Sequence, residues 1–314
     1  MNILVIGKKN HIPWPYYTAR GFEQNGHNTY LFYYNEYTFF DRIEKVFSKY
    51  KIQYKKFCFL LDTFHPDIIV FVSAFFIPKE YFYIAKERHI KTIGWIGDTF
   101  GVDKKEYKDI IDKLFLFDSS LMNLSQELGF NSEFLQVGYD ALLHKNFNYE
   151  RKNTINFIGS HTQKREMILQ NLKNFPLEIH GLKWNKLNFH PKQWTIHTQK
   201  INTQTLVQIY NTTISAINIS QIENVSNGIN MRIFETLACG SCLVSDNLID
   251  LPLCFEPNKE VLVYNTVDEL IELLDKIQND KKLVANIVNN VKVRLEKSQY
   301  TYKDRTDYMI HSLK

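Results

Sequence analysis

The chain opens with Asn2-Ile-Leu-Val-Ile-Gly7, a continuous apolar run that stops at a glycine. This pattern predicts a β-strand that is buried on both faces, as the strands of parallel sheets are. A helix is expected from Pro15 to Gly26 and a second strand over 28–33. The alternation then continues, with strands expected at 67–72, 91–96, 114–117 and 133–137 and helices at 40–61, 78–88, 103–112 and 119–128. Repeated strand–helix units predict a parallel sheet with helices on both faces.

The same pattern restarts at Thr154-Ile-Asn-Phe-Ile-Gly159, after a polar stretch at 138–153. Further strands are expected at 177–180, 213–219, 242–245 and 261–264, and helices at 163–173, 203–210, 230–238, 266–278 and 281–297. We therefore predict an α/β protein with two Rossmann-like domains that face each other across a cleft. The N-terminal domain spans 1–150 and the C-terminal domain 151–314, and the last helix, about 300–314, is a candidate to cross back to the first domain.

The length, composition and charge of the chain exclude several classes of protein. A length of 314 residues suits two domains, and four cysteines are too few for a disulfide framework. The net charge of +4 arises entirely within 151–314, which fits a small anionic ligand but is too weak for nucleic acid. The sequence shows no signal peptide and no apolar run of membrane-spanning length, so we expect a cytoplasmic protein. Lysines along 41–61 leave open a peripheral contact with the inner face of the membrane.

Several familiar motifs are missing from the sequence. The loop after the first strand has one glycine and no GxGxxG, which argues against a dehydrogenase. A Walker A motif, HExxH and GxSxG are also missing, which argues against ATPases, zinc proteases and α/β-hydrolases. Cys239-Gly-Ser-Cys242 has CxxC spacing, but no second pair accompanies it, so we predict no metal site.

The segment 226–246 carries the most chemistry. Asn227 and Gly228 lead into a predicted helix whose first turns hold Arg232 and Glu235. Free N–H groups at a helix N-terminus favour a phosphate, and the Arg232 fork suits a diphosphate. Glu235, three residues further, could accept hydrogen bonds from two ribose hydroxyls. The plainer alternative is an amphipathic helix with a surface Arg–Glu pair at i, i+3.

The run Asn230-Met-Arg-Ile-Phe-Glu-Thr-Leu-Ala-Cys-Gly240 resembles the donor motif of GT-B glycosyltransferases of group 1, in particular the spore-maturation CgeB-like family. The resemblance covers most of the chain in matching order. It includes Gly94-Trp-Ile-Gly-Asp98, Val137-Gly-Tyr-Asp140, Phe157-Ile-Gly-Ser160 and the pair Tyr302 and Arg305.

The resemblance implies a transferase (EC 2.4) that moves a sugar from a nucleotide-diphosphate sugar to a hydroxyl of a glycan or protein acceptor. The second domain would bind the donor, with UDP preferred over GDP, and the first would bind the acceptor. Glu235 would bind the ribose, and Arg232 with Arg165 the diphosphate. The remaining implied donor-site residues are Gly159, Ser160, His180, Gly181, Asn218, Asn227, Gly228 and Asn230. The sequence lacks an Asp-x-Asp pair, so we expect neither a metal nor a cofactor.

The stereochemical outcome is open, because Asn227 stands where retaining relatives have the first Glu of a Glu-x7-Glu motif. An inverting transfer needs a general base, for which His11 and Asp98 are candidates, and Arg232 would stabilise the leaving group. We prefer Asp98, although it could instead cap the next helix, and His11 could be a loop residue bonded to backbone. The rival functions are a GT-B sugar-nucleotide epimerase and a non-catalytic nucleotide-sugar-binding subunit of a glycosylation complex. The oligomeric state is not predicted.

Overall fold

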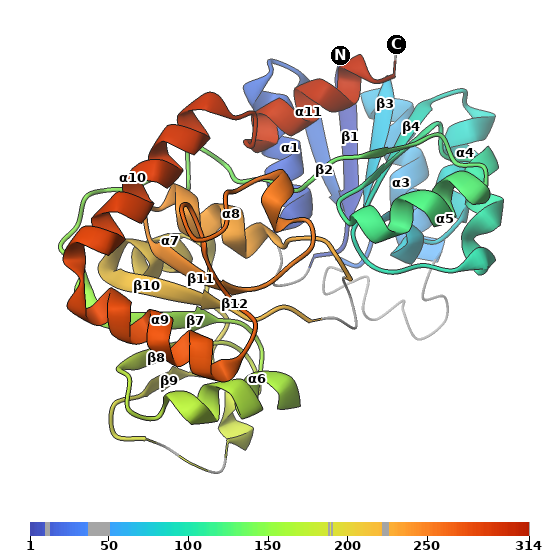
Figure 1. Cartoon of the computed structure of the whole chain (residues 1–314). Coiled ribbons are helices and arrows are strands. Elements are labelled where there is room, and N and C mark those ends of the chain that lie inside the picture. The colour runs from blue at the N-terminus through green and yellow to red at the C-terminus, as the bar shows by residue number, and fades with distance from the viewer. Residues whose placement is uncertain (10–12, 37–50, 188, 190, 222–225, 314) are drawn as a thin grey trace. The chain divides into compact units, whose positions relative to one another are not determined.

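A computed structural model describes residues 1–9, 13–36, 51–187, 189, 191–221 and 226–313. The chain forms two compact units (Figure 1). The first contains the described residues of Met1–Val137 together with 226–228 and 301–313. The second contains the described residues of Gly138–Gln221 and Ile229–Tyr300. None of the helices in these ranges combines the length and apolar character that crossing a bilayer requires.

The first unit is built on a six-stranded parallel sheet of order β2-β1-β3-β4-β5-β6. Its strands are β1 (Asn2–Gly7), β2 (Asn28–Tyr33), β3 (Ile68–Val72), β4 (Lys91–Ile96), β5 (Lys113–Leu116) and β6 (Ser132–Phe134). Its helices are α1 (Trp14–Gln24), α3 (Lys51–Phe64), α4 (Glu80–Glu87), α5 (Met122–Glu127) and α11 (Tyr302–His311), with 3-10 helices at Ala74–Phe76, Val102–Asp109 and Ser119–Leu121.

Helices cover both faces of this sheet. On one face, Leu4 and Phe71 pack with Phe57 of α3 and Phe82 of α4. On the other, α1 lies against α11, where the rings of Tyr17 and Tyr302 are 5.5 Å apart (Figure 1). The inner strands β1 and β3 are buried on both sides, which explains why their sequences are continuous apolar runs, whereas the edge strands β2 and β6 are only partly buried.

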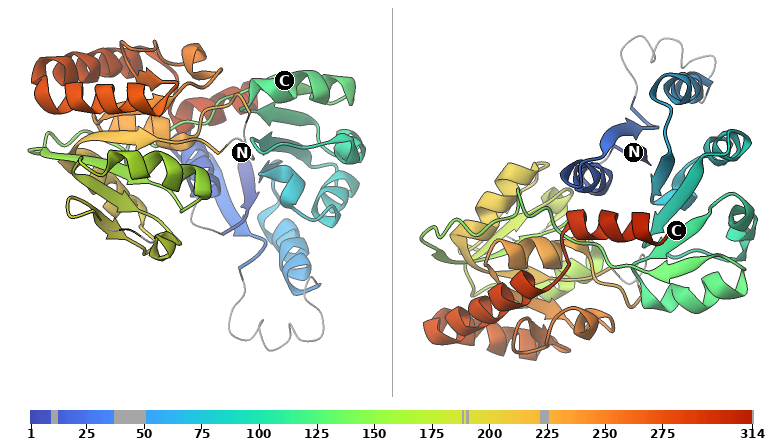
Figure 2. Two further views of the ribbon diagram at one scale, coloured as in Figure 1. Left: turned by 60° about the horizontal axis from the view of Figure 1, so that its bottom comes forward. Right: turned by 90° about the horizontal axis from the view of Figure 1, so that it is seen from above.

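The second unit repeats this plan with strand order β12-β11-β10-β7-β8-β9, again all parallel. The strands are β7 (Lys152–Ile158), β8 (Leu177–His180), β9 (Thr195–His197), β10 (Thr213–Asn218), β11 (Cys242–Asp246) and β12 (Leu262–Tyr264). The helices are α6 (Gln163–Leu169), α7 (Thr203–Thr212), α8 (Met231–Ala238), α9 (Val267–Asn279) and α10 (Lys281–Lys297), with 3-10 helices at Gln170–Leu172, Trp184–Lys186 and Leu251–Leu253. Figure 2 shows helices on both faces of each sheet.

The α/β class with two Rossmann-like sheets is confirmed, and three details differ from expectation. The units divide between Val137 and Gly138 and not near 150, because 138–150 packs onto the second unit: the Tyr139 amide donates to Tyr300, and Asn211 bonds Lys145 and Phe147. The segment expected as an α-helix over 103–112 is a 3-10 helix with only Tyr107 buried, too little apolar surface to support α-helical packing. The edge strand β9 was not expected at all.

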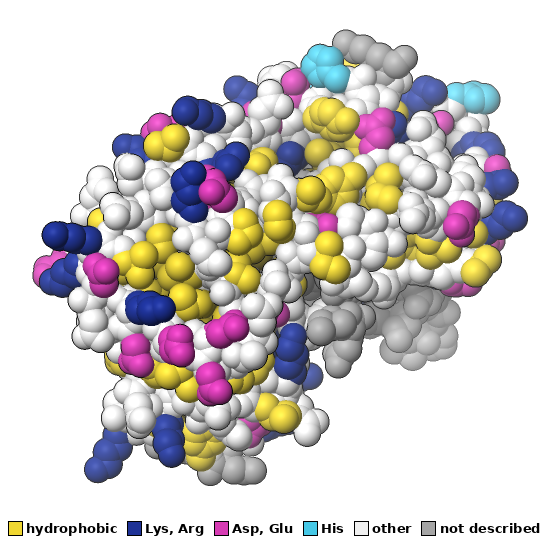
Figure 3. Space-filling model, in the orientation of Figure 1, with side chains coloured by type: hydrophobic (Ala, Val, Ile, Leu, Met, Phe, Trp, Pro, Cys, Tyr) yellow, Lys and Arg dark blue, Asp and Glu magenta, His cyan; other side chains and the backbone are white. Residues whose placement is uncertain are grey.

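The helix expected over 40–61 is described only from Lys51 onward, as α3. Of the lysines considered for a membrane contact, those at 45 and 49 lie outside the described residues. On the face drawn in Figure 3, basic and acidic side chains are interspersed without a broad basic stripe.

Replacing Gly21 tests the contact between α1 and α11. A Cβ atom at Gly21 would lie 2.4 Å from the backbone oxygen of Tyr302. We expect Gly21→Ala to lower the free energy of unfolding by about 1–3 kcal/mol, because α11 must shift, even though alanine favours helices. Denaturant unfolding measures this, with Glu23→Ala on the exposed side of α1 as the control. Stabilisation by Gly21→Ala would contradict the packing.

Candidate functional site

The N-terminus of α8 lies at the carboxyl edge of the second sheet. Asn230 caps the helix: its side-chain oxygen accepts from the Arg232 amide at 3.0 Å. Its Nδ2 atom donates to Oδ1 of Asn218, the last residue of β10, at 2.9 Å. Three residues assigned to the donor site from sequence are thus brought together. The edge of a parallel sheet and the start of a helix are where such folds bind anionic ligands.

Arg232 and Glu235 form an ion pair inside the unit. Nη1 of Arg232 lies 2.6 Å from Oε2 of Glu235. The Glu235 side chain has no exposed surface, whereas 23% of the Arg232 side chain is exposed. The surface pair considered as the plainer alternative is therefore not what forms. The predicted contact of Glu235 with a ribose would have to be made by a carboxylate that is closed off from solvent in this structure.

His144 is a buried neighbour of this pair that sequence reasoning missed. Its Nε2 atom lies 3.6 Å from Oε1 of Glu235, and its Nδ1 atom lies 3.1 Å from the carbonyl oxygen of Asp140. Burial lowers the pKa of His144, against the opposing effect of the Glu235 carboxylate, so the ring is neutral near pH 7. Residue 144 falls in a stretch that resembles a polar linker, and no periodicity marks it as buried.

Arg165 of α6 ties together two strand ends. Its Nη1 atom donates to the carbonyl oxygen of Ser160 at 2.8 Å, and its Nη2 atom donates to that of Ile219 at 3.0 Å. Burial lowers the pKa of Arg165 to about 10, and the guanidinium lies over the Phe157 ring. Arg165 is therefore near Ser160, as the resemblance implies, but its donors are directed at backbone carbonyls.

Gly159 and Gly181 allow the ends of β7 and β8 to approach closely. A Cβ atom on Gly181 would lie 2.0 Å from the Gly159 carbonyl oxygen. The Gly159 amide donates to the His180 carbonyl, and Trp184 Nε1 donates to the Gly159 carbonyl at 2.7 Å. The His180 side chain instead contacts Glu178, with 2.8 Å between Nε2 and Oε1.

Asn227 and Gly228, two further predicted donor-site residues, belong to the first unit. The carboxylate of Asp118, which is fully buried, accepts from the amides of Ser226 at 2.7 Å and Asn227 at 3.2 Å. Asn227 Nδ2 also donates to the Ser119 hydroxyl at 3.0 Å. The loop that precedes α8 is therefore held by the residues that follow β5.

Of the two candidate bases, the structure describes one. Asp98 follows β4, and burial raises the pKa of its carboxyl group, which moves it toward the range useful for a general base near neutral pH. It does not cap the next helix, since that helix begins at Val102 after Gly101. His11 lies outside the described residues.

Comparisons with known proteins agree with this architecture. Residues 163–311 match the family model described as "Glycosyl transferase-like". The sequence matches no curated protein. Sucrose-phosphate synthase from Thermosynechococcus elongatus has a similar structure, with a TM-score of 0.70, 10% identity and coverage of 99% of this chain and 98% of that one.

Two further solved structures extend the likeness. HepE from Anabaena in complex with UDP and glucose has a TM-score of 0.65 at 10% identity, covering 100% of this chain and 99% of that one. A glycosyltransferase from Rickettsia africae has a TM-score of 0.68 at 12% identity, covering 99% and 97%. The fold is the GT-B type with two Rossmann-like domains. The family match over 163–311 makes the chain a transferase of the glycosyltransferase class.

The buried ring of His144 predicts a pH dependence of stability. Because its folded pKa lies below the ordinary 6.5, the unfolded chain takes up a proton that the folded chain does not. Stability from this residue is fully present above pH 6.5 and is lost as pH falls through the folded pKa. We expect His144→Gln to flatten the decline in unfolding free energy between about pH 7 and pH 5. Urea titrations measure it, with the exposed His311→Gln as control. Equal slopes in wild type and His144→Gln would contradict the assignment.

Proposed function

We propose that this chain transfers a sugar from a nucleotide-diphosphate sugar, UDP-linked in first place, to a hydroxyl group of a glycan or protein acceptor, without a metal ion. The observation that carries the proposal is the start of α8: a capped helix N-terminus with Arg232 in its first turn, at the carboxyl edge of the sheet in a glycosyl transferase-like domain. The resemblance to the CgeB-like branch supports it.

The proposed reaction gives separate roles to Asp98 and Arg232. Asp98 accepts the proton of the acceptor hydroxyl, whose oxygen then attacks the anomeric carbon of the sugar. The bond between that carbon and the phosphate oxygen breaks, and the nucleoside diphosphate leaves with the electron pair. Such a displacement inverts the anomeric centre. Arg232 and the N–H groups of α8 stabilise the negative charge on the departing phosphate.

Solved structures of similar fold support a UDP-sugar as donor. Crystal structures of Anabaena HepE contain UDP-glucose in one case and UDP in another. These ligands were bound to HepE, which is 10–11% identical to this chain. That this chain also binds a UDP-sugar is part of our proposal.

Substituting Arg232 tests the donor site without removing the charge that Glu235 needs. Arg232→Lys keeps a cation beside the buried carboxylate but loses the planar fork. A hydrogen bond to a charged group is worth roughly 1.5–3 kcal/mol, so we expect UDP affinity to fall by about ten- to a hundredfold. Calorimetric titration with UDP and GDP measures this, and turnover should fall as well.

Lys276→Ala, an exposed cation in the last turn of α9, is the matched control and should bind UDP as the wild type does. Wild-type UDP affinity in a folded Arg232→Lys variant would remove this residue from the donor site. Hydrolysis or epimerisation of the UDP-sugar without any acceptor would favour the epimerase alternative.

Metal independence makes a separate prediction. Turnover should persist after exhaustive treatment with EDTA, because the proposal assigns phosphate stabilisation to Arg232 and the α8 N-terminus. Product formation is measured with and without added Mg²⁺ or Mn²⁺. Complete loss of turnover in EDTA that either ion restores would overturn this part of the mechanism.

A further inference from the structure

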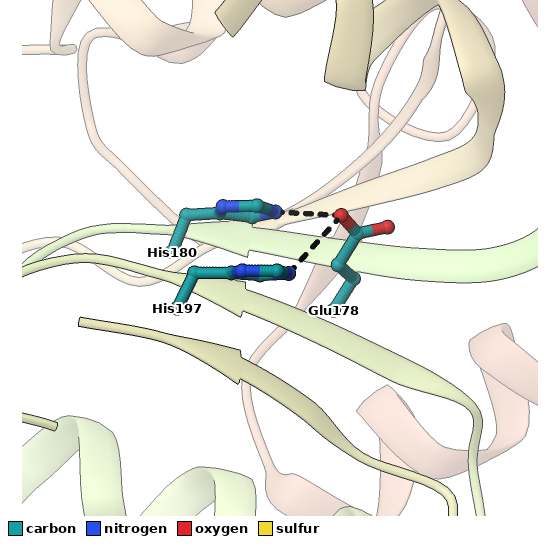
Figure 4. A group of neighbouring side chains, drawn as sticks. All are labelled: Glu178, His180 and His197. Atoms are coloured by element: carbon teal, nitrogen blue, oxygen red, sulfur yellow. Dashed lines mark hydrogen bonds and ion pairs between the residues drawn. The ribbon is translucent and has the colours of Figure 1, made fainter. Parts of the chain in front are cut away.

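Two edge strands of the second sheet bring together three side chains that bear metal-ligand atoms. In the parallel pairing of β8 with β9, Glu178 lies opposite Thr195 and His180 lies opposite His197. Because side chains alternate along a strand, Glu178 and His180 share one face, and His197 stands beside His180 on that face. Figure 4 shows both imidazole rings directed at the Glu178 carboxylate.

The three groups converge on one point. Nε2 of His180 lies 2.8 Å from Oε1 of Glu178, and Nε2 of His197 lies 3.7 Å from the same oxygen. The candidate ligand atoms of the three residues all lie within 4.8 Å of one another. Within the part of the chain that the structure describes, no other three His, Cys, Asp or Glu side chains meet this condition.

The three side chains differ in how far they are exposed to solvent. His180 is nearly buried, with 5% of its side chain exposed, and Glu178 has 24% exposed. His197 has 46% of its side chain exposed, so an ion can approach from solvent on its side. Nδ1 of His180 is buried without a hydrogen bond, and Nε2 is the nitrogen that contacts Glu178. To bind an ion through Nε2, the ring must give up the proton that Nε2 donates to the carboxylate.

We propose that Glu178, His180 and His197 bind one divalent transition-metal ion, Zn²⁺ in first place, with water completing the coordination. Two imidazoles and one carboxylate suit Zn²⁺, Ni²⁺ or Co²⁺, whereas Mg²⁺ prefers a set of oxygen ligands. The site is distinct from the metal-free chemistry proposed for the transfer reaction. Its role is to join the short edge strand β9 to β8.

The stacking of the two imidazole rings shows which side chain must move when an ion binds. The imidazoles of His180 and His197 lie 4.3 Å apart and almost parallel, at 7°. Each imidazole binds an ion along the in-plane lone pair of its nitrogen, and two nearly parallel stacked rings cannot both direct these lone pairs at one tetrahedral ion. The exposed His197 ring must therefore turn toward the ion, and its ring-proton NMR signals should shift on titration.

The test titrates tag-free, chelator-dialysed protein with ZnCl₂ by calorimetry. We expect one equivalent to bind and the melting temperature to rise. His197→Ala and Glu178→Gln should each weaken Zn²⁺ binding by roughly a hundredfold, since even outer-shell losses cost about 10–100-fold. His311→Ala, which removes an exposed histidine from α11, should bind Zn²⁺ as the wild type does.

Co²⁺ should give the absorption bands of a nitrogen-ligated ion, and Mg²⁺ should give no heat of binding. The proposal is overturned if the wild type takes up no Zn²⁺, or if a folded His197→Ala variant binds Zn²⁺ equally well. None of these readouts depends on nucleotide binding or turnover, so failure of the transferase proposal would leave this result interpretable.

Discussion

The Glu235 carboxylate is buried without any exposed surface, and the start of α8 and the segment that holds His144 meet at that charge. Moving a carboxylate out of water costs several kcal/mol unless a cation and hydrogen bonds compensate. Arg232, one turn earlier on α8, supplies the cation at 2.6 Å. The neutral ring of His144 closes the other side of the carboxylate. His144 lies in the segment that follows the first unit, so this segment packs against the buried pair.

The two arginines that the family resemblance groups together have different surroundings. Arg165 directs its donors at the carbonyl oxygens of Ser160 and Ile219, and so holds the ends of β7 and β10 in place. Arg232 faces a carboxylate and keeps part of its surface exposed. The first is built into the scaffold of the sheet edge, whereas the second combines a structural contact with access to solvent. A motif gives both the same label, since it records residue type and order but not the direction of a side chain.

Much of the fold could be predicted because its inner strands are buried on both faces. Continuous apolar runs such as Ile68–Val72 identify such strands without any tertiary information. The strand β9 was not predicted, because a three-residue edge strand is too short to show a hydrophobic periodicity. Long-range contacts were also beyond reach: nothing local in 138–150 indicates that His144 would meet Glu235. Glu178 and His180 do stand two apart, as same-face residues of a strand do, but their partner His197 comes from β9.

The first unit is discontinuous along the chain, and this has a consequence for biosynthesis. Its sheet is complete once Phe134 has been made, yet the face of α1 around Gly21 is covered by α11, which begins at Tyr302. The Asp118 carboxylate accepts from the nearby Ser120 amide, but it receives the amides of Ser226 and Asn227 only after those residues have emerged. During vectorial synthesis, the Asp118 carboxylate lacks these two amides until residue 227 has been made, and the apolar surface on α1 stays uncovered until the whole second unit has been translated. The N-terminal half therefore spends that interval as an incomplete domain, the state in which nascent chains are most prone to aggregate and to engage chaperones.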